Sequence, residues 1–299
     1  MKKGFFQQMY KSSRTLRVAL CQYNVQFKNV QHNRNRVEEL LKNTQPNGFD
    51  VLVFPEMSLT GYMFEDKQDV FPFCEEQGKG EYFDFCLNLA KSFNCAVCCG
   101  YPEKEALVQS NTLNTLENYS LYNSMYFISP DGSFVNYRKH FLYETDMRWC
   151  SEGEGFKAIH FSLDSKTIVD QSSESTVKLG LGICMDINNG TDYTTKYSAK
   201  EFANFHKTNG SEVVLFIANW LASEEPKKCI TTQSYWVERL SPMISHSCPY
   251  FVACNRVGTE KDILFAGGSC VIGLDKQQPF ILESFACDDE GIKVIHLDL

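Results

Sequence analysis

Short apolar segments alternate with longer amphipathic ones along almost the whole chain, and this alternation restricts the fold more than any other feature. Apolar runs bounded by turn residues are typical of strands, whereas apolar residues spaced three and four apart are typical of helices. Strands are predicted at 17–25, 50–54, 95–101, 122–128, 133–138, 177–183, 213–218, 250–254, 268–274 and 279–285, and helices at 33–43, 81–93, 197–207 and 232–246. The pattern predicts an α/β protein.

The same pattern indicates how the chain is divided. No linker rich in Pro, Gly or Ser interrupts it, and no segment is repeated. We therefore expect a single domain over 17–299, preceded by a flexible tail over 1–16. Ser129-Pro130-Asp131-Gly132 predicts a hairpin turn between two of the strands. Pro242 is expected to interrupt or bend the last helix, and the polar stretch 163–176 to form a surface loop.

Charge and hydropathy exclude two classes of partner. The 299 residues include 29 Lys and Arg against 37 Asp and Glu, a net charge of −8. An acidic chain without a basic stripe is a poor ligand for nucleic acid. No segment has the roughly 18 uninterrupted apolar residues that a membrane span needs. We therefore expect neither nucleic acid nor a membrane as a partner, and the sequence leaves open whether two copies form a homodimer.

The chain contains 13 cysteines, and their positions indicate a reducing compartment. Most lie inside apolar segments, where a free thiol packs as a small hydrophobic side chain; these are Cys21, Cys95, Cys98, Cys99, Cys254 and Cys270. Cys95 and Cys98 lie within a predicted strand and have no second pair of matching spacing, so no metal site is predicted. We expect a cytoplasmic protein. The amino terminus has no acidic residue before Glu38, which leaves a mitochondrial transit segment as the alternative.

Three predicted strands end on side chains whose chemistry is complementary. The strand 177–183 ends at Cys184, the strand 50–54 is followed by Glu56, and the strand 133–138 is followed by Lys139. In α/β proteins, ligands bind where strands end. A thiol is a weak nucleophile at neutral pH until a base removes its proton or a cation stabilises the thiolate. Glu56 could accept that proton, and Lys139 could stabilise the oxyanion that forms when a thiolate attacks an amide.

Each of these residues also has a structural explanation when it is taken alone. A cysteine after a buried strand is usually packed there, Glu56 follows a proline in a turn, and Lys139 lies between Arg138 and His140 in a basic segment. The combination is more informative, because each group supplies what another lacks.

Three segments that contain these residues resemble the glutamate, lysine and cysteine motifs of the nitrilase superfamily of carbon–nitrogen hydrolases. They are 53–62, 137–142 and 182–186, and they occur in the order that the superfamily has. Supporting segments at 122–124, 219–220, 255–258 and 265–269 also match. The resemblance implies a four-layer α-β-β-α sandwich, a catalytic set of Glu56, Lys139 and Cys184, and no metal or organic cofactor.

Longer segments resemble one branch of that superfamily, the protein N-terminal amidases. The matching segments are 137–149, 182–187 and 255–260, and Met185 after the cysteine fits this branch better than the branches that act on free amides. The resemblance implies deamidation of amino-terminal Asn or Gln of polypeptides to Asp or Glu, through a cysteine thioester, in the N-degron pathway.

An amino-terminal substrate carries an α-ammonium, so its pocket should present acidic or carbonyl groups. Asp186 adjoins the proposed nucleophile and is the first candidate, with a structural role in the following turn as the alternative. The other candidates for substrate binding are Met185, Glu144, Asp146, Tyr62 and Trp220. The superfamily also carries a second glutamate between the lysine and the cysteine. Glu152 and Glu154 both fit that position, and the sequence does not choose between them.

Three other functions compete with this interpretation. A small-molecule amidase of the same superfamily, such as an ω-amidase or a carbamoyl-amine hydrolase, would use the same three residues. A non-catalytic binding protein on this scaffold would have no evident need for them. A papain-like hydrolase would need a histidine base, and none of the six histidines lies in a recognisable cysteine-protease setting.

Overall fold

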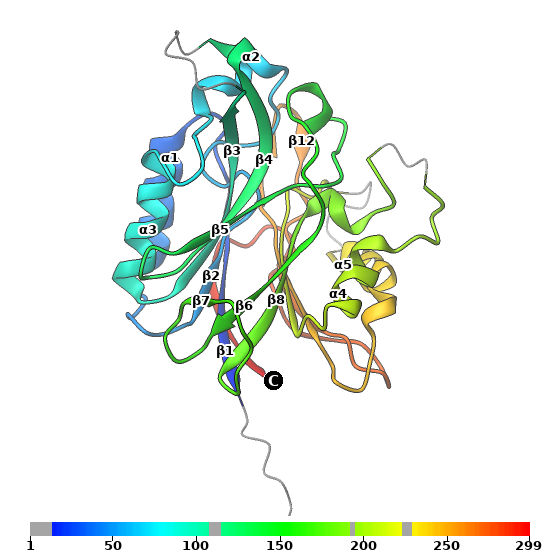
Figure 1. The fold of residues 1–299 in the computed structure, drawn as a ribbon. Coiled ribbons are helices and arrows are strands. Elements are labelled where there is room, and N and C mark those ends of the chain that lie inside the picture. The colour runs from blue at the N-terminus through cyan, green and yellow to red at the C-terminus, as the bar shows by residue number, and fades with distance from the viewer. Residues whose placement is uncertain (1–13, 108–114, 192–194, 223–228) are drawn as a thin grey trace, which may run out of the picture.

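Two large β-sheets form the centre of the molecule in a computed structural model of the chain (Figure 1). The structure describes residues 14–107, 115–191, 195–222 and 229–299. Most of the tail predicted at 1–16 lies outside these residues. In the described chain, no helix is long and apolar enough to cross a membrane.

The first sheet has six strands in the order β15-β1-β2-β3-β4-β5. Their bounds are β1 Thr15–Gln22, β2 Val51–Val53, β3 Ala96–Ala106, β4 Tyr119–Ile128, β5 Phe134–Arg138 and β15 Gly291–Asp298. β1, β2 and β3 are parallel, whereas β4, β5 and β15 pair antiparallel to their neighbours. β4 and β5 form the hairpin predicted from the turn at 129–132, with Ile128 opposite Phe134.

The second sheet has seven strands in the order β14-β13-β10-β9-β8-β6-β7. Their bounds are β6 Lys157–Ser162, β7 Ile168–Val169, β8 Thr176–Ile183, β9 Val213–Ile217, β10 Tyr250–Cys254, β13 Cys270–Gly273 and β14 Phe280–Ser284. The three central strands β8, β9 and β10 are parallel. A separate pair, β11 Thr259–Glu260 and β12 Ile263–Leu264, forms a small two-stranded sheet.

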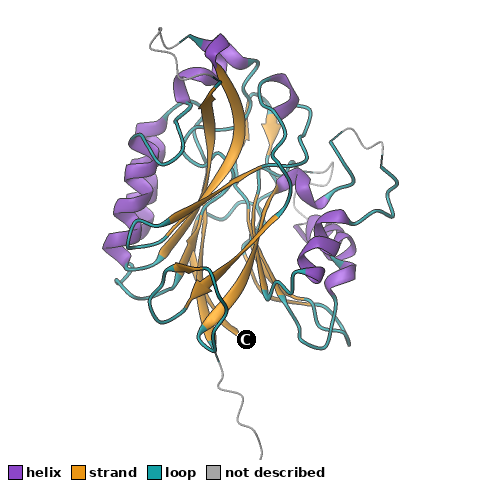
Figure 2. Cartoon of the chain, in the orientation of Figure 1, coloured by secondary structure: helices purple, strands orange, loops and turns teal. Residues whose placement is uncertain are grey.

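Helices cover the outer face of each sheet, which gives four layers (Figures 1 and 2). α1 Val30–Leu41 and α3 Glu81–Phe93 lie on the first sheet, and α4 Glu201–Thr208 and α5 Cys229–Arg239 lie on the second. Shorter elements are α2 Lys67–Val70 and the 3-10 helices η1 Phe71–Phe73, η2 Leu116–Asn118, η3 Asp146–Arg148, η4 Cys184–Ile187 and η5 Ser241–Met243. The predicted α/β class and the four-layer sandwich are confirmed.

Alternation along the strands explains why both faces of the first sheet are buried. In β1, Leu16, Val18 and Leu20 point into the core between the two sheets, whereas Ala19 and Cys21 point toward the outer helices. Successive side chains of a strand point to opposite faces, so a strand that is apolar at every position must be covered on both. The sandwich supplies a cover for each face.

Several details differ from the prediction, and the strands β6, β11 and β12 have no counterpart among the predicted ones. β15 was not predicted, and it pairs with β1 at the edge of the first sheet. The predicted loop at 163–176 contains β7. α4 begins at Glu201 rather than at 197, and α5 ends at Arg239, with the turn η5 at Pro242.

The cysteines follow the prediction with one exception. All six of the cysteines predicted to be buried are buried and free. Cys229 and Cys287, by contrast, form a disulfide between the start of α5 and the loop after β14. That pairing could not be read from spacing, because 58 residues separate the two.

Candidate active site

Local backbone geometry presents the three predicted residues at one place between the sheets. Glu56 follows β2 and Lys139 follows β5, both in the first sheet, and Cys184 follows β8 in the second. Cys184 has φ 42°, in the left-handed region that non-glycine residues rarely adopt. It is the residue at which β8 turns sharply into η4. Such strain is maintained only where the surrounding structure enforces it, and it is common at functional sites.

Lys139 joins two carboxylates in a fully buried cluster. Its Nζ lies 2.7 Å from Glu56 Oε1 and 2.6 Å from Asp146 Oδ2, and all three side chains are 0% exposed. Two carboxylates and one ammonium leave the cluster with an excess of negative charge. Buried charge is expensive unless it is paired and hydrogen-bonded, so the surrounding residues must satisfy the remaining oxygen atoms.

Neighbouring amide and hydroxyl groups do so. Asn123 Nδ2 donates to Glu56 Oε1 at 2.7 Å and to Asp146 Oδ1 at 3.0 Å. The backbone N–H of Asn219 donates to Glu56 Oε2 at 2.7 Å, and its side-chain Nδ2 donates to the Glu56 carbonyl at 3.0 Å. Tyr62 Oη donates to Asp146 Oδ2 at 3.1 Å. These contacts hold the Glu56 carboxylate and the Lys139 ammonium in fixed positions.

Burial and charge shift the pKa values of Glu56, Lys139 and Cys184. Burial raises the pKa of the Glu56 carboxyl, with Asp146 reinforcing the shift and Lys139 opposing it. Burial alone would lower the pKa of Lys139, but Asp146 and Glu56 outweigh it and hold that pKa well above its ordinary value. Burial and the Glu56 charge raise the pKa of the Cys184 thiol, which Lys139 offsets only in part. The resting site therefore holds a thiol, a cationic lysine and a carboxylate of increased basicity.

A cavity of about 190 Å³ opens onto Cys184. Four of the predicted residues line it, namely Tyr62, Cys184, Met185 and Trp220. The other lining residues are Tyr143, Asn188, Asn219 and Leu221. Its walls are therefore aromatic, apolar or neutral amide groups, as is common in pockets for small ligands.

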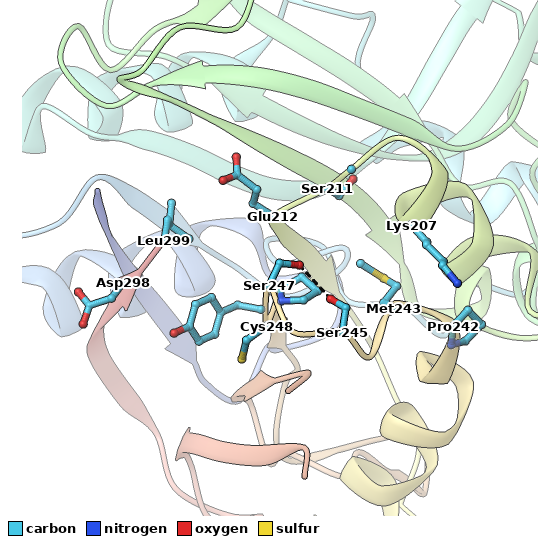
Figure 3. Close-up of a pocket in the computed structure, with 13 residues that line it drawn as sticks. Lys207, Ser211, Glu212, Pro242, Met243, Ser245, Ser247, Cys248, Asp298 and Leu299 are labelled. Carbon is cyan, nitrogen blue, oxygen red and sulfur yellow. Dashed lines mark hydrogen bonds between the residues drawn. The ribbon is translucent and has the colours of Figure 1, made fainter. Parts of the chain in front are cut away.

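A second cavity of about 180 Å³ lies at the other end of the second sheet (Figure 3). It is lined by Glu212 and Tyr250, at the starts of β9 and β10, whereas Cys184 and Asn219 follow the ends of β8 and β9. Glu212 is engaged by Arg14 and by the backbone N–H of Lys178. None of the predicted site residues lines this cavity.

The structure gives Asp186 a structural role rather than a place in the pocket. Its Oδ1 accepts from the backbone N–H groups of His140 and Phe141, both at 2.9 Å. Its Oδ2 accepts from Tyr137 Oη at 2.7 Å and from the N–H of Ile183 at 2.8 Å. The carboxylate thus ties the end of β5 to the end of β8. The expectation that Asp186 binds the ammonium is corrected, because both its oxygen atoms are fully engaged.

The predicted second glutamate is also corrected. Glu152 and Glu154 are exposed, and Glu152 contacts Thr191 rather than Lys139. Asp146, predicted to bind substrate, occupies the position beside Lys139, because η3 folds the chain back onto it. Glu144 is exposed and does not line the pocket.

Several pocket and cluster residues were not among the predicted ones. Asn123 and Asn219 lie in segments that matched supporting motifs of the superfamily. The sequence therefore indicated that they lie near the site, but it did not indicate which groups they contact. Tyr143 lies in the segment 137–149, which resembled the amidase branch, whereas Asn188 and Leu221 carried no signal of their own. Within the described residues, no group of three or more His, Cys, Asp or Glu is arranged to hold a metal ion.

Comparisons with known proteins identify the family to which the chain belongs. A model of the carbon-nitrogen hydrolase family matches residues 17–277. The chain is 31% identical over 268 residues to a protein N-terminal amidase of Schizosaccharomyces pombe, covering 83% of this chain and 87% of that protein. A protein N-terminal amidase of Saccharomyces cerevisiae is 31% identical over 222 residues, covering 70% of this chain and 46% of that protein. A crystal structure of an N-terminal amidase has a TM-score of 0.77 at 19% identity, covering 96% of this chain and 99% of the other.

Proposed function

The chain belongs to the carbon–nitrogen hydrolase family, and from that premise we propose that it hydrolyses the side-chain amide of an amino-terminal Asn or Gln of a polypeptide. The observation that carries the proposal is the cluster in which Lys139 joins Glu56 to Asp146, next to the pocket that contains Cys184. The cytoplasmic setting expected from the buried thiols is part of the same proposal.

In the first half of the cycle, Glu56 removes the proton of the Cys184 thiol. The thiolate attacks the amide carbon, and the Lys139 ammonium stabilises the oxyanion of the tetrahedral intermediate. The C–N bond then breaks, and the leaving nitrogen takes the proton that Glu56 holds. Ammonia departs and a thioester remains on Cys184.

In the second half, Glu56 accepts a proton from a water molecule that attacks the thioester carbon. Lys139 again stabilises the oxyanion. The C–S bond breaks, the Cys184 sulfur recovers a proton from Glu56, and the carboxylic acid leaves. The net reaction converts an amide and water into an acid and ammonia, and it leaves the enzyme unchanged.

The charges of the site support these roles. The raised pKa of the Cys184 thiol means that the thiolate does not form without a base. The raised pKa of Glu56 makes it a better base for that thiol than an exposed carboxylate would be. The raised pKa of Lys139 keeps it cationic, as an oxyanion-stabilising group must be.

The substrate is proposed from the relatives. The two yeast proteins that are 31% identical to this chain are named protein N-terminal amidases. A structural neighbour of that name was solved with a Gln-Gly peptide, with a TM-score of 0.76 at 19% identity. A likeness at that identity supports the fold, so the substrate class rests on the yeast relatives.

Mass spectrometry of short peptides tests the proposal. Peptides that begin with Asn or Gln should gain the mass that accompanies conversion of an amide to an acid, whereas their N-acetylated forms and free glutamine should not. Cys184→Ala is the matched control and should show no conversion. Turnover of free amides without turnover of peptides would instead favour a small-molecule amidase.

A further inference from the structure

The segment that follows β9 forms one rung of a small antiparallel ladder, in which Leu221 lies opposite Phe265. The hydrogen bonds on either side run from Ala266 N to Trp220 O and from Ala222 N to Leu264 O, both at 2.8 Å. In an antiparallel ladder, a residue flanked by its neighbours' bonds in this way directs its own N–H and C=O to the other side. The backbone groups of Leu221 therefore point away from Phe265.

Those two backbone groups are unpaired. Within the described chain, neither the N–H nor the C=O of Leu221 has a hydrogen-bond partner, although the residue is only partly exposed. Backbone polar groups removed from water are nearly always paired in folded proteins. An open donor and an open acceptor on one strand edge are what an extended peptide pairs with.

The open side of Leu221 is the side of the proposed nucleophile. β9 lies between β10 and β8 in the sheet. The Phe265 segment is bonded through Gly258 and Arg256 to the chain that follows β10, so it lies on the β10 side. The opposite side is that of β8, whose end carries Cys184. Leu221 and Cys184 accordingly line the same cavity.

The distance along the strands suits a glutamine side chain. Ile183 pairs with Ile217, so Cys184 is level with residue 218, and Leu221 lies three residues further on, about 10 Å of extended chain. A glutamine side chain spans about 5 Å between its amide carbon and its backbone carbonyl carbon. The attacking sulfur stands about 3 Å beyond that amide carbon. The distance from Cys184 to Leu221 along the strands is therefore comparable to the distance from the attacking sulfur to the backbone carbonyl carbon of a bound glutamine.

The pocket also needs an acceptor for the α-ammonium. None of the described residues that line it is a carboxylate. A backbone carbonyl can accept a charge-assisted hydrogen bond from an ammonium without adding a negative charge beside Glu56.

We propose that the backbone of Leu221 binds the main chain of the substrate's first residue. Its C=O accepts from the α-ammonium, and its N–H donates to the carbonyl of the first residue, as in an antiparallel pair. This role rests on the proposed function, and it makes Leu221 a main-chain specificity determinant whose side chain is secondary.

Two substrates that differ in the first-residue carbonyl isolate the contribution of the Leu221 N–H, which is proposed to donate to that carbonyl. Gln-Gly contains the first-residue carbonyl, whereas 4-aminopentanamide keeps the ammonium and the side-chain amide but has a methyl group in place of that carbonyl. Leu221→Pro removes the N–H without breaking a ladder bond, since that N–H faces away from Phe265. The ratio of kcat/KM for Gln-Gly to that for 4-aminopentanamide should fall by about tenfold in this variant, because a carbonyl is left unpaired.

Leu221→Ala is the matched variant, because it shortens the side chain and keeps the N–H. Its ratio should stay within about twofold of the wild-type ratio, the scatter expected when no hydrogen bond is lost. An unchanged ratio in Leu221→Pro, or an equal fall in both variants, would overturn the role of the N–H. Wild-type protein that does not deamidate Gln-Gly at all would instead overturn the proposed function.

A measurement on the unperturbed backbone covers the case in which Leu221→Pro does not fold. Cys184→Ala protein with isotope-labelled leucine can be titrated with Gln-Gly and followed by NMR. The Leu221 amide proton should move downfield and become protected from exchange with solvent. Saturating Gln-Gly that leaves this resonance in place would overturn the proposal.

Discussion

Two buried ionic clusters of this protein differ in the balance of their charges. Arg256 and Glu260 form a pair of one cation and one anion, with side chains 0% and 1% exposed. The cluster at Lys139 has one cation and two anions, all 0% exposed. The first therefore has no excess charge, whereas the second retains a negative one. Both are equally remote from water, so charge balance is what separates them.

The balanced pair holds backbone in place. Arg256 donates to the carbonyl of Val25, and Glu260 Oε1 accepts from the N–H of Tyr62 at 2.9 Å and from that of Met63 at 2.5 Å. The unbalanced cluster lies next to Cys184, and burial raises the pKa of Glu56, with the second carboxylate, Asp146, reinforcing the shift and Lys139 opposing it. The balanced pair thus fixes the loop that carries Tyr62, while burial and the second carboxylate of the other cluster make Glu56 a stronger base.

The largest expected effect is on catalysis. Glu56→Gln should lower kcat by about 1,000-fold, because the proposed base is lost. Its stability should fall by no more than about 1–2 kcal/mol, since the remaining Lys139–Asp146 pair is balanced and only the Asn219 N–H loses a good acceptor. Ammonia release and chemical denaturation measure the two quantities. A kcat within tenfold of wild type would contradict the assignment.

Breaking the balanced pair should act on stability instead. Glu260→Gln should cost about 3–5 kcal/mol of unfolding free energy, because it leaves the Arg256 guanidinium buried and unpaired. Glu283→Gln is the control, since the Glu283–Lys293 pair is 45% and 36% exposed, and it should cost less than about 1 kcal/mol. Equal losses in the two variants would show that burial of the pair does not matter here.

His206 is a buried titratable group with no opposite charge to pair with among the described residues, so burial sets the direction of its pKa shift. Burial lowers the pKa of His206 from 6.5 to about 3. As pH falls below 6.5, the unfolded chain binds a proton that the folded protein does not, so stability is lost between pH 6.5 and about 3. At pH 5 the loss from this group is about 2 kcal/mol. The unfolding free energy, measured by denaturation at pH 7 and pH 5, should fall by about 2 kcal/mol less in His206→Gln than in the wild type. An equal pH dependence in both proteins would refute this role of His206.

The smallest expected effect comes from changing the charge balance of the Lys139 cluster. Asp146→Asn removes one of the two negative charges and should lower the pKa of Glu56. Because Glu56 must be ionised to act as a base, the acid limb of kcat/KM should move to lower pH. The rate on the plateau should fall by about tenfold, as expected when the partner that orients Lys139 is weakened. An acid limb that stays in place, or moves to higher pH, would mean that Asp146 does not set the pKa of the base.

Much of the fold could be predicted because the central strands are apolar at consecutive positions. β15 escaped prediction because its partner β1 lies at the other end of the chain, with Thr15 opposite Asp298. The start of α4 was misplaced for a tertiary reason. The Arg239 guanidinium donates hydrogen bonds to the backbone carbonyls of Tyr197 and Ala199. Residues 197–199 are therefore held outside the helix.

The site could be predicted only as far as strand ends determine it. Glu56, Lys139 and Cys184 each follow a strand closely, so the sheet topology sets their positions. Asp146 and Asp186 lie within short turns, and the direction of a turn is not encoded in spacing. From the sequence, both were candidates for substrate binding, with a structural role as the alternative for Asp186. The structure places Asp146 on Lys139 and Asp186 on backbone N–H groups.

The distribution of the site over both sheets has a consequence for the newly made chain. Glu56 and Lys139 follow strands of the first sheet, Cys184 and Asn219 follow strands of the second, and 163 residues separate Glu56 from Asn219. Contacts between such distant residues form late, because a long loop must close first. A molecule whose two sheets have not yet packed together therefore holds the Cys184 thiol apart from the proposed base Glu56 and the proposed oxyanion-stabilising group Lys139. Its chemistry begins when the sandwich is complete, so enzymatic turnover reports directly on the fully folded population.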